Sequence, residues 1–125
     1  MLLFNLLAMR ACVGVVGRAT LLGFDSTPAN PVAGDNVSTW IAYSLPSPAI
    51  TGGTATYGIS LNGLPFPPTV DDLCTQTACP KDPGDYNESS YAIFPSGVSG
   101  KIVSSITWRD QDDAVVWCVE TTWKV

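Results

Sequence analysis

Histidine is absent from this sequence, and charged residues make up only 14% of it. Without an imidazole, the hydrolase and metal-hydrolysis mechanisms that depend on histidine are excluded. No serine lies in a Gly-x-Ser-x-Gly turn, so that nucleophile is missing as well. The acidic run 110–113 lacks the glycine and the distal glutamate of a calcium loop. We therefore expect neither an enzyme nor a metal site, and no cofactor.

Basic residues are few, with six Lys and Arg against eleven Asp and Glu, and they are scattered along the chain. A net charge of −5 without a basic cluster argues against nucleic acid as a partner. The same charge disfavours lasting attachment to anionic lipid but permits brief membrane contact through apolar groups. No apolar run approaches the roughly 20 residues that span a bilayer.

No helical period of apolar residues is present, whereas alternation with period two is frequent. It recurs over 37–45, 55–61, 86–94, 102–108 and 115–125, and an apolar segment covers 21–24. Asn62 and Gly63 form a strong tight-turn signal after the second of these segments. At 125 residues the chain suits one domain. These patterns predict an all-β fold, an immunoglobulin-like antiparallel sandwich of six or seven strands.

The alternation also predicts which side chains face inward. If Asn36 carries a glycan and faces water, Val37, Ile41 and Tyr43 point inward, which leaves Trp40 exposed. The last strand places Val115, Trp117 and its alternate neighbours on one face and Val116 on the other. Periodicity alone does not distinguish a filled core from a hollow one lined by the same residues, so both alternatives stay open.

Four cysteines allow three pairings. Cys74 and Cys79 are separated by four residues and flanked by turn-forming sequence, so they suit a small closed loop that holds the neighbouring segment 63–68 in a set direction. An even cysteine count and the glycosylation sequons at Asn36 and Asn87 favour an oxidising compartment, hence a secreted or lumenal protein. We interpret residues 1–11 as a remnant of a signal peptide and 12–125 as the domain.

A set of short motifs occurs in a specific order along the chain. It runs Pro31-Val32-Ala33-Gly34, Gly63-Leu64-Pro65-Phe66-Pro67, Asp72-Leu73-Cys74, Cys79-Pro80, Gly84-Asp85, Phe94-Pro95, Trp108 with Asp112-Asp113, and Trp117-Cys118-Val119-Glu120. This order resembles the ML lipid-recognition family, which includes the Niemann-Pick type C lysosomal sterol carrier, phosphatidylglycerol/phosphatidylinositol transfer proteins and group 2 mite allergens. The resemblance covers Cys12 to Val125.

The resemblance implies a sandwich whose two sheets hold a lipid between them. It implies disulfides Cys12–Cys118 and Cys74–Cys79, with Phe66 at the opening of the cavity and Trp108 and Trp117 on its wall. The candidate lipid-binding residues are Val37, Ile41, Tyr43, Tyr57, Ile59, Leu61, Phe66, Phe94, Ile102, Ile106, Trp108, Trp117 and Val119.

The function implied is lipid binding and transfer between membranes by a monomer in the endolysosomal or vacuolar lumen or outside the cell. The wording Asp72-Leu73-Cys74 is closer to the phospholipid-transfer branch, and the sterol carrier's additional cysteine pair is absent. A phospholipid is therefore favoured over a sterol. The alternative is an immunoglobulin-like adhesion or structural module with a filled core.

Overall fold

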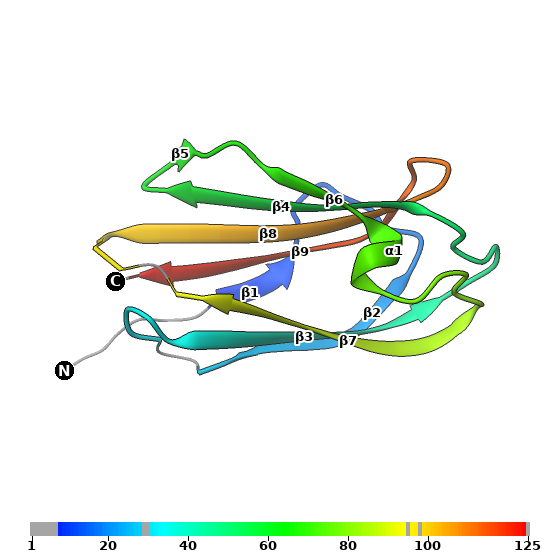
Figure 1. Ribbon diagram of the computed structural model, residues 1–125, viewed down its shortest axis with the longest axis horizontal. Coiled ribbons are helices and arrows are strands. Elements are labelled where there is room, and N and C mark those ends of the chain that lie inside the picture. Colours follow the sequence, from blue (N-terminus) through cyan, green and yellow to red (C-terminus); the bar gives the residue numbers. More distant parts are fainter. Residues whose placement is uncertain (1–7, 29–30, 95, 98, 125) are drawn as a thin grey trace.

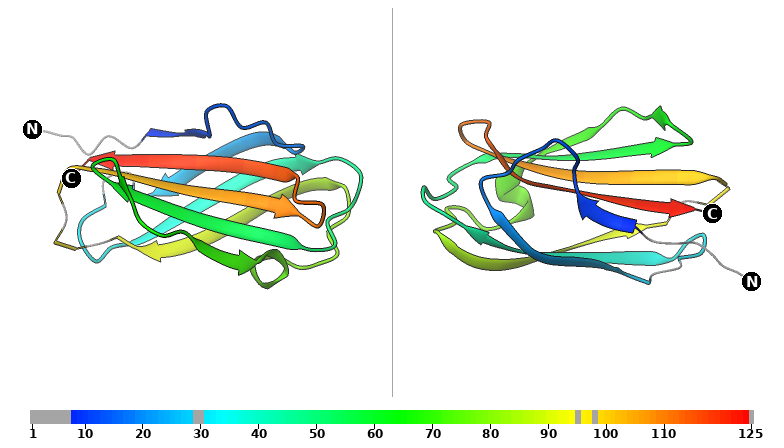
Figure 2. Two further views of the ribbon diagram at one scale, coloured as in Figure 1. Left: turned by 90° about the horizontal axis from the view of Figure 1, so that it is seen from above. Right: turned by 180° about the vertical axis from the view of Figure 1, so that it is seen from behind.

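Two antiparallel β-sheets face each other in the computed structural model, which describes residues 8–28, 31–94, 96–97 and 99–124. Figure 1 shows the sheets as two layers, and Figure 2 shows the same layers from above and from behind. The described residues contain nine strands and one short helix. Six of these strands have eight or more residues. The prediction of an immunoglobulin-like sandwich of six or seven strands is confirmed, with three short strands added.

The larger sheet has the order β1-β9-β8-β4-β5, and β6 also pairs with β4. Its long strands are β4 (Gly53–Leu61), β8 (Lys101–Asp110) and β9 (Val115–Lys124). The turn between β4 and β5 follows the sequence signal, because Asn62 and Gly63 both have the positive φ angles that such a turn requires. The short strands are β1 (Ala8–Ala11), β5 (Leu64–Pro65) and β6 (Thr69–Asp72).

The smaller sheet has the order β2-β3-β7, with β2 at Thr20–Thr27, β3 at Asn36–Leu45 and β7 at Gly84–Ile93. On β3, Val37, Ile41 and Tyr43 are buried as predicted, and Trp40 is exposed. Asn36 and Asn87 are both exposed, and their glycosylation stays a prediction. One edge of this sheet is β7, which pairs only with β3 among the described strands.

One predicted side-chain direction is wrong. Val116 was expected on the outer face of the last strand, but it is fully buried in the core. The pairing of β8 with β9 shifts register at this point, since Trp108 pairs with Trp117 and Arg109 pairs with Val115. Val116 is thus the extra residue of a β-bulge, which breaks the strict alternation of side chains and turns Val116 inward beside Trp117.

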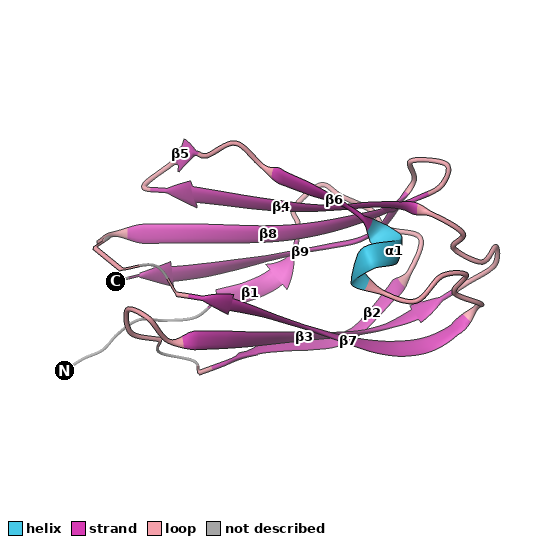
Figure 3. Ribbon diagram, in the orientation of Figure 1, coloured by secondary structure: helices cyan, strands magenta, loops and turns pink. Residues whose placement is uncertain are grey.

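The loop closed by Cys74 and Cys79 contains a helical turn, α1 (Leu73–Gln76), shown in cyan in Figure 3. Asp72 caps this turn, because its carboxylate accepts a hydrogen bond of 2.9 Å from the Cys74 N–H. Leu73 is fully buried and anchors the turn in the core. The disulfide loop therefore holds α1 beside the edge of β4 and β6.

The second disulfide joins Cys12 to Cys118, with the Cα atoms 5.4 Å apart. Both disulfides agree with the pairing that the family resemblance implies. Residues 1–7 lie outside the described residues, so the interpretation of 1–11 as a signal-peptide remnant stays a prediction. Within that segment, Ala8–Ala11 pairs with β9 as an edge strand.

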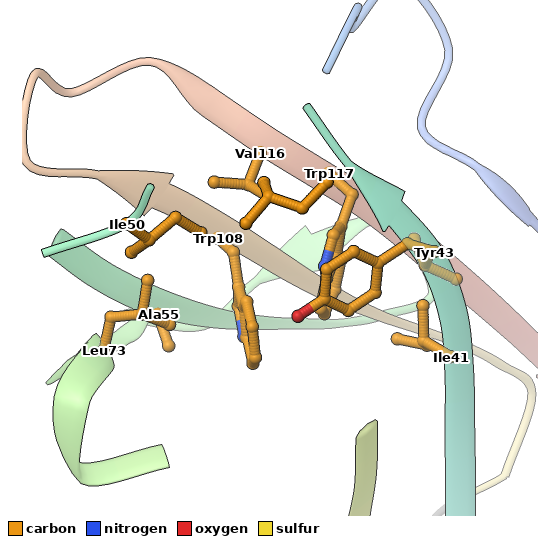
Figure 4. Packing of buried hydrophobic residues seen from close by; sticks show 10 residues of the cluster. Ile41, Tyr43, Ile50, Ala55, Leu73, Trp108, Val116 and Trp117 are labelled. Carbon is orange, nitrogen blue, oxygen red and sulfur yellow. The ribbon is translucent and has the colours of Figure 1, made fainter. Parts of the chain in front are cut away.

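Aromatic side chains fill one half of the sandwich, next to α1 and the β8–β9 turn. The rings of Trp108 and Trp117 stack at 4.7 Å, and Tyr43 lies 6.1 Å and 6.0 Å from them. Figure 4 shows these three rings among Ile50, Leu73 and other buried side chains. Edge and stacked contacts of this kind add about 0.5–1.5 kcal/mol per pair to the burial of apolar area. This half of the molecule is a packed core.

Candidate functional site

A cavity of about 580 Å³ occupies the other half of the space between the sheets. Its volume lies within the range of about 300–1,000 Å³ that small-molecule sites occupy. The wall draws on both sheets and includes the edge strand β7 on one side and β6 on the other. The lining residues are Val37, Thr39, Tyr57, Gly58, Ile59, Pro67, Thr69, Asp71, Gln76, Ser89, Ser90, Tyr91, Ala92, Ile93, Phe94, Ile102, Ser104, Ile106 and Trp123.

The end of the cavity farthest from the packed core is apolar. Val37, Phe94, Ile102 and Trp123 form a small buried cluster there, and each exposes 7% of its surface or less. The rings of Phe94 and Trp123 meet edge to face at 5.6 Å. The second pair of β8 with β9 at this end brings Ile102 opposite Trp123. These side chains offer an inner surface suited to hydrocarbon.

The opposite end of the cavity lies beside α1 and is polar. There the Tyr57 hydroxyl donates a hydrogen bond of 2.8 Å to Oε1 of Gln76, the last residue of α1. Asp71 faces inward from β6, paired in register with Ala55. Burial, and secondly the negative charge of Asp71, raises the pKa of Tyr57 above its ordinary value. Tyr57 therefore stays a neutral hydrogen-bonding group at physiological pH.

A carboxylate network joins the packed core to this polar end. Glu88 of β7 accepts a hydrogen bond of 2.9 Å from the Tyr43 hydroxyl and lies 3.1 Å from Nζ of Lys81. Thr77, just after α1, donates to the same carboxylate at 3.3 Å. The Lys81 ammonium also lies 3.9 Å from the centre of the Tyr86 ring. Because the network connects α1 to β3 and β7, it holds the two sheets together at the point where the cavity ends.

Tyr43 gives this network a measurable dependence on alkaline pH. Burial, and then the charge and hydrogen bond of Glu88, raises the pKa of Tyr43 well above its ordinary value. The unfolded chain releases the Tyr43 proton above about pH 10, whereas the folded chain keeps it. The free energy of unfolding should therefore be undiminished below pH 10 and fall above it, by up to about 1.4 kcal/mol per pH unit for this proton. Tyr57 contributes in the same direction.

Urea denaturation at a series of pH values between 9 and 11.5 checks this expectation. In Tyr43→Phe, the free energy of unfolding should fall less steeply above pH 10, by about 1.4 kcal/mol per pH unit, because the proton of Tyr43 is no longer released on unfolding. The matched control is Tyr91→Phe, because Tyr91 is 69% exposed and its hydroxyl has no partner among the described residues. Equal slopes for the two variants would show that Tyr43 does not keep its proton in the folded state.

Six of the predicted lipid-binding residues line the cavity, namely Val37, Tyr57, Ile59, Phe94, Ile102 and Ile106. Leu61 packs against the apolar cluster but is not part of the cavity wall. Phe66 is 49% exposed on the segment after β5, and its neighbour Pro67 contributes to the wall instead. Within the described residues, the structure therefore does not place Phe66 in the cavity.

The remaining five predicted residues belong to the packed core. Tyr43 and Val119 belong to the core cluster and do not line the cavity. Ile41, Trp108 and Trp117 do not line it either, and they border a gap of about 30 Å³, roughly the volume that one water molecule occupies in the liquid. Aromatic rings stacked against one another leave no room between them, which is why these inward-facing residues fill space and do not enclose it.

Several lining residues were missed by sequence reasoning. The alternation on the last strand placed Trp123 on the same inward face as Trp117, but Trp123 was not among the residues predicted to bind lipid. Thr69 and Asp71 alternate inward on β6, a strand concealed by the preceding proline-rich segment. Gln76 had no signal, because its position depends on how α1 packs. Serines at 89, 90 and 104 also contribute to the wall.

The described residues contain no group of three or more Cys, Asp or Glu side chains that could hold a metal ion. The single helical turn that the structure describes is too short to cross a membrane.

A family model described as the ML domain matches residues 7–125, almost the whole chain. The chain belongs to the ML-domain family. The ML domain here has a fold similar to that of a Niemann-Pick type C2 protein from the Japanese carpenter ant, with a TM-score of 0.71 and 12% identity over 92% of this chain and 96% of the ant protein.

A second similar structure is chicken MD-1, which was crystallised in complex with lipid IVa. Its TM-score is 0.62 at 12% identity, over 94% of the present ML domain and 88% of the MD-1 chain. At this identity both likenesses concern the fold alone. A comparison with curated proteins gave no match.

Proposed function

We propose that this protein binds a single lipid between its two sheets and carries it between membranes without chemical change. The observation that carries the proposal is the 580 Å³ cavity, which is apolar at its buried end and polar beside α1. This arrangement matches an amphipathic ligand whose tail lies among Val37, Phe94 and Trp123. Membership of the ML family and the fold shared with MD-1, a protein crystallised with lipid IVa, support the same function.

The driving force for uptake is burial of hydrocarbon. Each CH₂ group transferred from water to the apolar end contributes about 0.8 kcal/mol, so ten such groups supply about 8 kcal/mol before the costs of ordering. No bond has to be made or broken, and we propose no enzymatic role. Two disulfides are typical of proteins outside the cytosol, which supports transfer in an extracellular or lumenal compartment. The donor and acceptor membranes are contacted transiently by a monomer.

Native mass spectrometry with solvent extraction tests this function on protein purified from its own host. We expect one bound lipid per chain, and the extracted lipid identifies its class. A phospholipid is our first expectation and a sterol the second. A lipid-free mass, together with no uptake from vesicles of phosphatidylcholine, phosphatidylglycerol or cholesterol-containing phosphatidylcholine, would contradict lipid binding and favour an adhesion or structural module.

A further inference from the structure

We infer that Asp71 makes the α1 end of the cavity selective for a ligand whose polar group carries no net negative charge, and that anionic lipids are disfavoured. The inference rests on the proposed function and adds to it the class of head group. Asp71 lines the cavity from β6, on the inner face of the larger sheet. Its carboxylate forms no ion pair within the part of the chain that the structure describes.

The charges around the cavity all disfavour an anionic ligand. Among the described residues no lysine or arginine lines the 580 Å³ cavity. The nearest basic group in the network, Lys81, is only 7% exposed and lies against Glu88 and the Tyr86 ring. Its charge is therefore offset by Glu88 and is not available to a ligand. The Asp71 charge remains without a compensating cation at this end.

The polar end also offers hydrogen-bond acceptors to a donating ligand group. Asp71 supplies two carboxylate oxygens, and Ser90, which pairs with Thr39 and faces inward from β7, supplies a hydroxyl group. Tyr57 already donates its hydroxyl proton to Gln76, so the phenol oxygen is left as an acceptor. A hydroxyl or an ammonium group can donate to these atoms, whereas a head group with a net negative charge is repelled by Asp71.

The ligand is oriented by the same difference between the two ends. An acyl chain that avoids water fits the cluster of Val37, Phe94, Ile102 and Trp123, which places the polar group near Asp71 and Gln76. Asp71 is partly buried in the cavity wall, so its charge is screened less than a charge in bulk water, and an anionic head group beside it is disfavoured. A tenfold difference in affinity corresponds to only about 1.4 kcal/mol.

Three lipids with the same oleoyl chain test the inference: monooleoylglycerol, oleoyl-lysophosphatidylcholine and oleoyl-lysophosphatidylglycerol. Their dissociation constants are measured on the purified, disulfide-bonded protein by native mass spectrometry and by tryptophan fluorescence, below their micelle concentrations. The unsubstituted protein should bind the anionic lipid about tenfold more weakly than the other two. Asp71→Asn should bring the three affinities to within about threefold of one another.

A matched control and a second variant make the test specific. Asp85→Asn removes one negative charge from an exposed position outside the cavity and should leave the discrimination unchanged. Gln76→Glu keeps an acceptor oxygen for Tyr57 but adds a negative charge, and it should increase the discrimination. A thermal melt of each variant shows that it folds.

Each outcome has one meaning. Equal affinity of the unsubstituted protein for all three lipids, or discrimination that Asp71→Asn leaves intact, would overturn the selectivity of Asp71 while lipid binding stands. Binding of none of the three lipids would overturn the proposed function together with this inference. Discrimination that disappears in Asp71→Asn, persists in Asp85→Asn and grows in Gln76→Glu supports the inference.

Discussion

Ile106→Trp should reduce lipid uptake at least tenfold and change the melting temperature of the lipid-free protein by only a few degrees. Ile106 lies on β8, is partly exposed to the cavity, and borders both the 580 Å³ cavity and the 30 Å³ gap beside the packed core. The larger indole can extend into the open space, where it displaces ligand instead of compressing neighbouring side chains. Transfer of a fluorescent phospholipid between vesicles measures uptake, and calorimetry measures stability.

Val119→Trp is the matched control, because Val119 pairs with Ile106 across β8 and β9 but lies in the packed core, 2% exposed. Overpacking a filled site typically costs about 1–3 kcal/mol, so this variant should melt several degrees lower. Trp40→Ala, on the outer face of β3, should affect uptake less than Ile106→Trp. A large loss of stability in Ile106→Trp with transfer unchanged would mean that Ile106 belongs to a filled core.

Removing the long disulfide should destabilise the protein far more than removing the short one. The bridge Cys12–Cys118 connects residues 106 apart in sequence, whereas Cys74 and Cys79 are 5 apart. On the chain-entropy model the long bridge contributes about 5 kcal/mol and the short one about 2 kcal/mol. The first value is comparable with the whole stability of many single domains, so Cys12→Ala with Cys118→Ala should be largely unfolded at 37 °C.

Guanidinium denaturation of the two double alanine variants measures both contributions under identical conditions. The Cys74→Ala, Cys79→Ala variant should keep most of its stability, although α1 loses its covalent support and the polar end of the cavity should bind lipid less tightly. Similar losses of stability in the two variants would mean that loop length does not determine the contribution. The measured losses of stability should be smaller than the chain-entropy values where the native structure relaxes after the disulfide is removed.

The strand pattern of this chain was predictable because side-chain alternation and turn chemistry are local properties. The inward parity of Val37, Ile41 and Tyr43 depends only on neighbouring residues, and so does the turn at Asn62 and Gly63. Val116 shows the limit of this approach. Its bulge arises from the register between β8 and β9. An alternating sequence does not show at which position one strand contains an extra residue relative to its partner.

The division of the interior into a filled and a hollow half was not predictable, since both halves are lined by inward-facing apolar residues. Trp108 and Trp117 stack because the paired strands place them opposite each other, and Tyr43 approaches them from the other sheet. Ile106, one alternation away on β8, packs against the edge of this core and also borders the cavity. Asp71 was missed for a related reason, because a four-residue strand after three prolines has too short a pattern to recognise.

The filled half and the hollow half of the interior should differ in the substitutions that they tolerate during evolution. Substitutions around Tyr43, Trp108 and Trp117 threaten folding itself, so selection should tolerate few of them. Substitutions at Ile59, Asp71 or Ser104 alter the shape or the polarity of the cavity that is available to a ligand. A lineage can therefore exchange its cargo by accumulating changes in the second set while its scaffold persists.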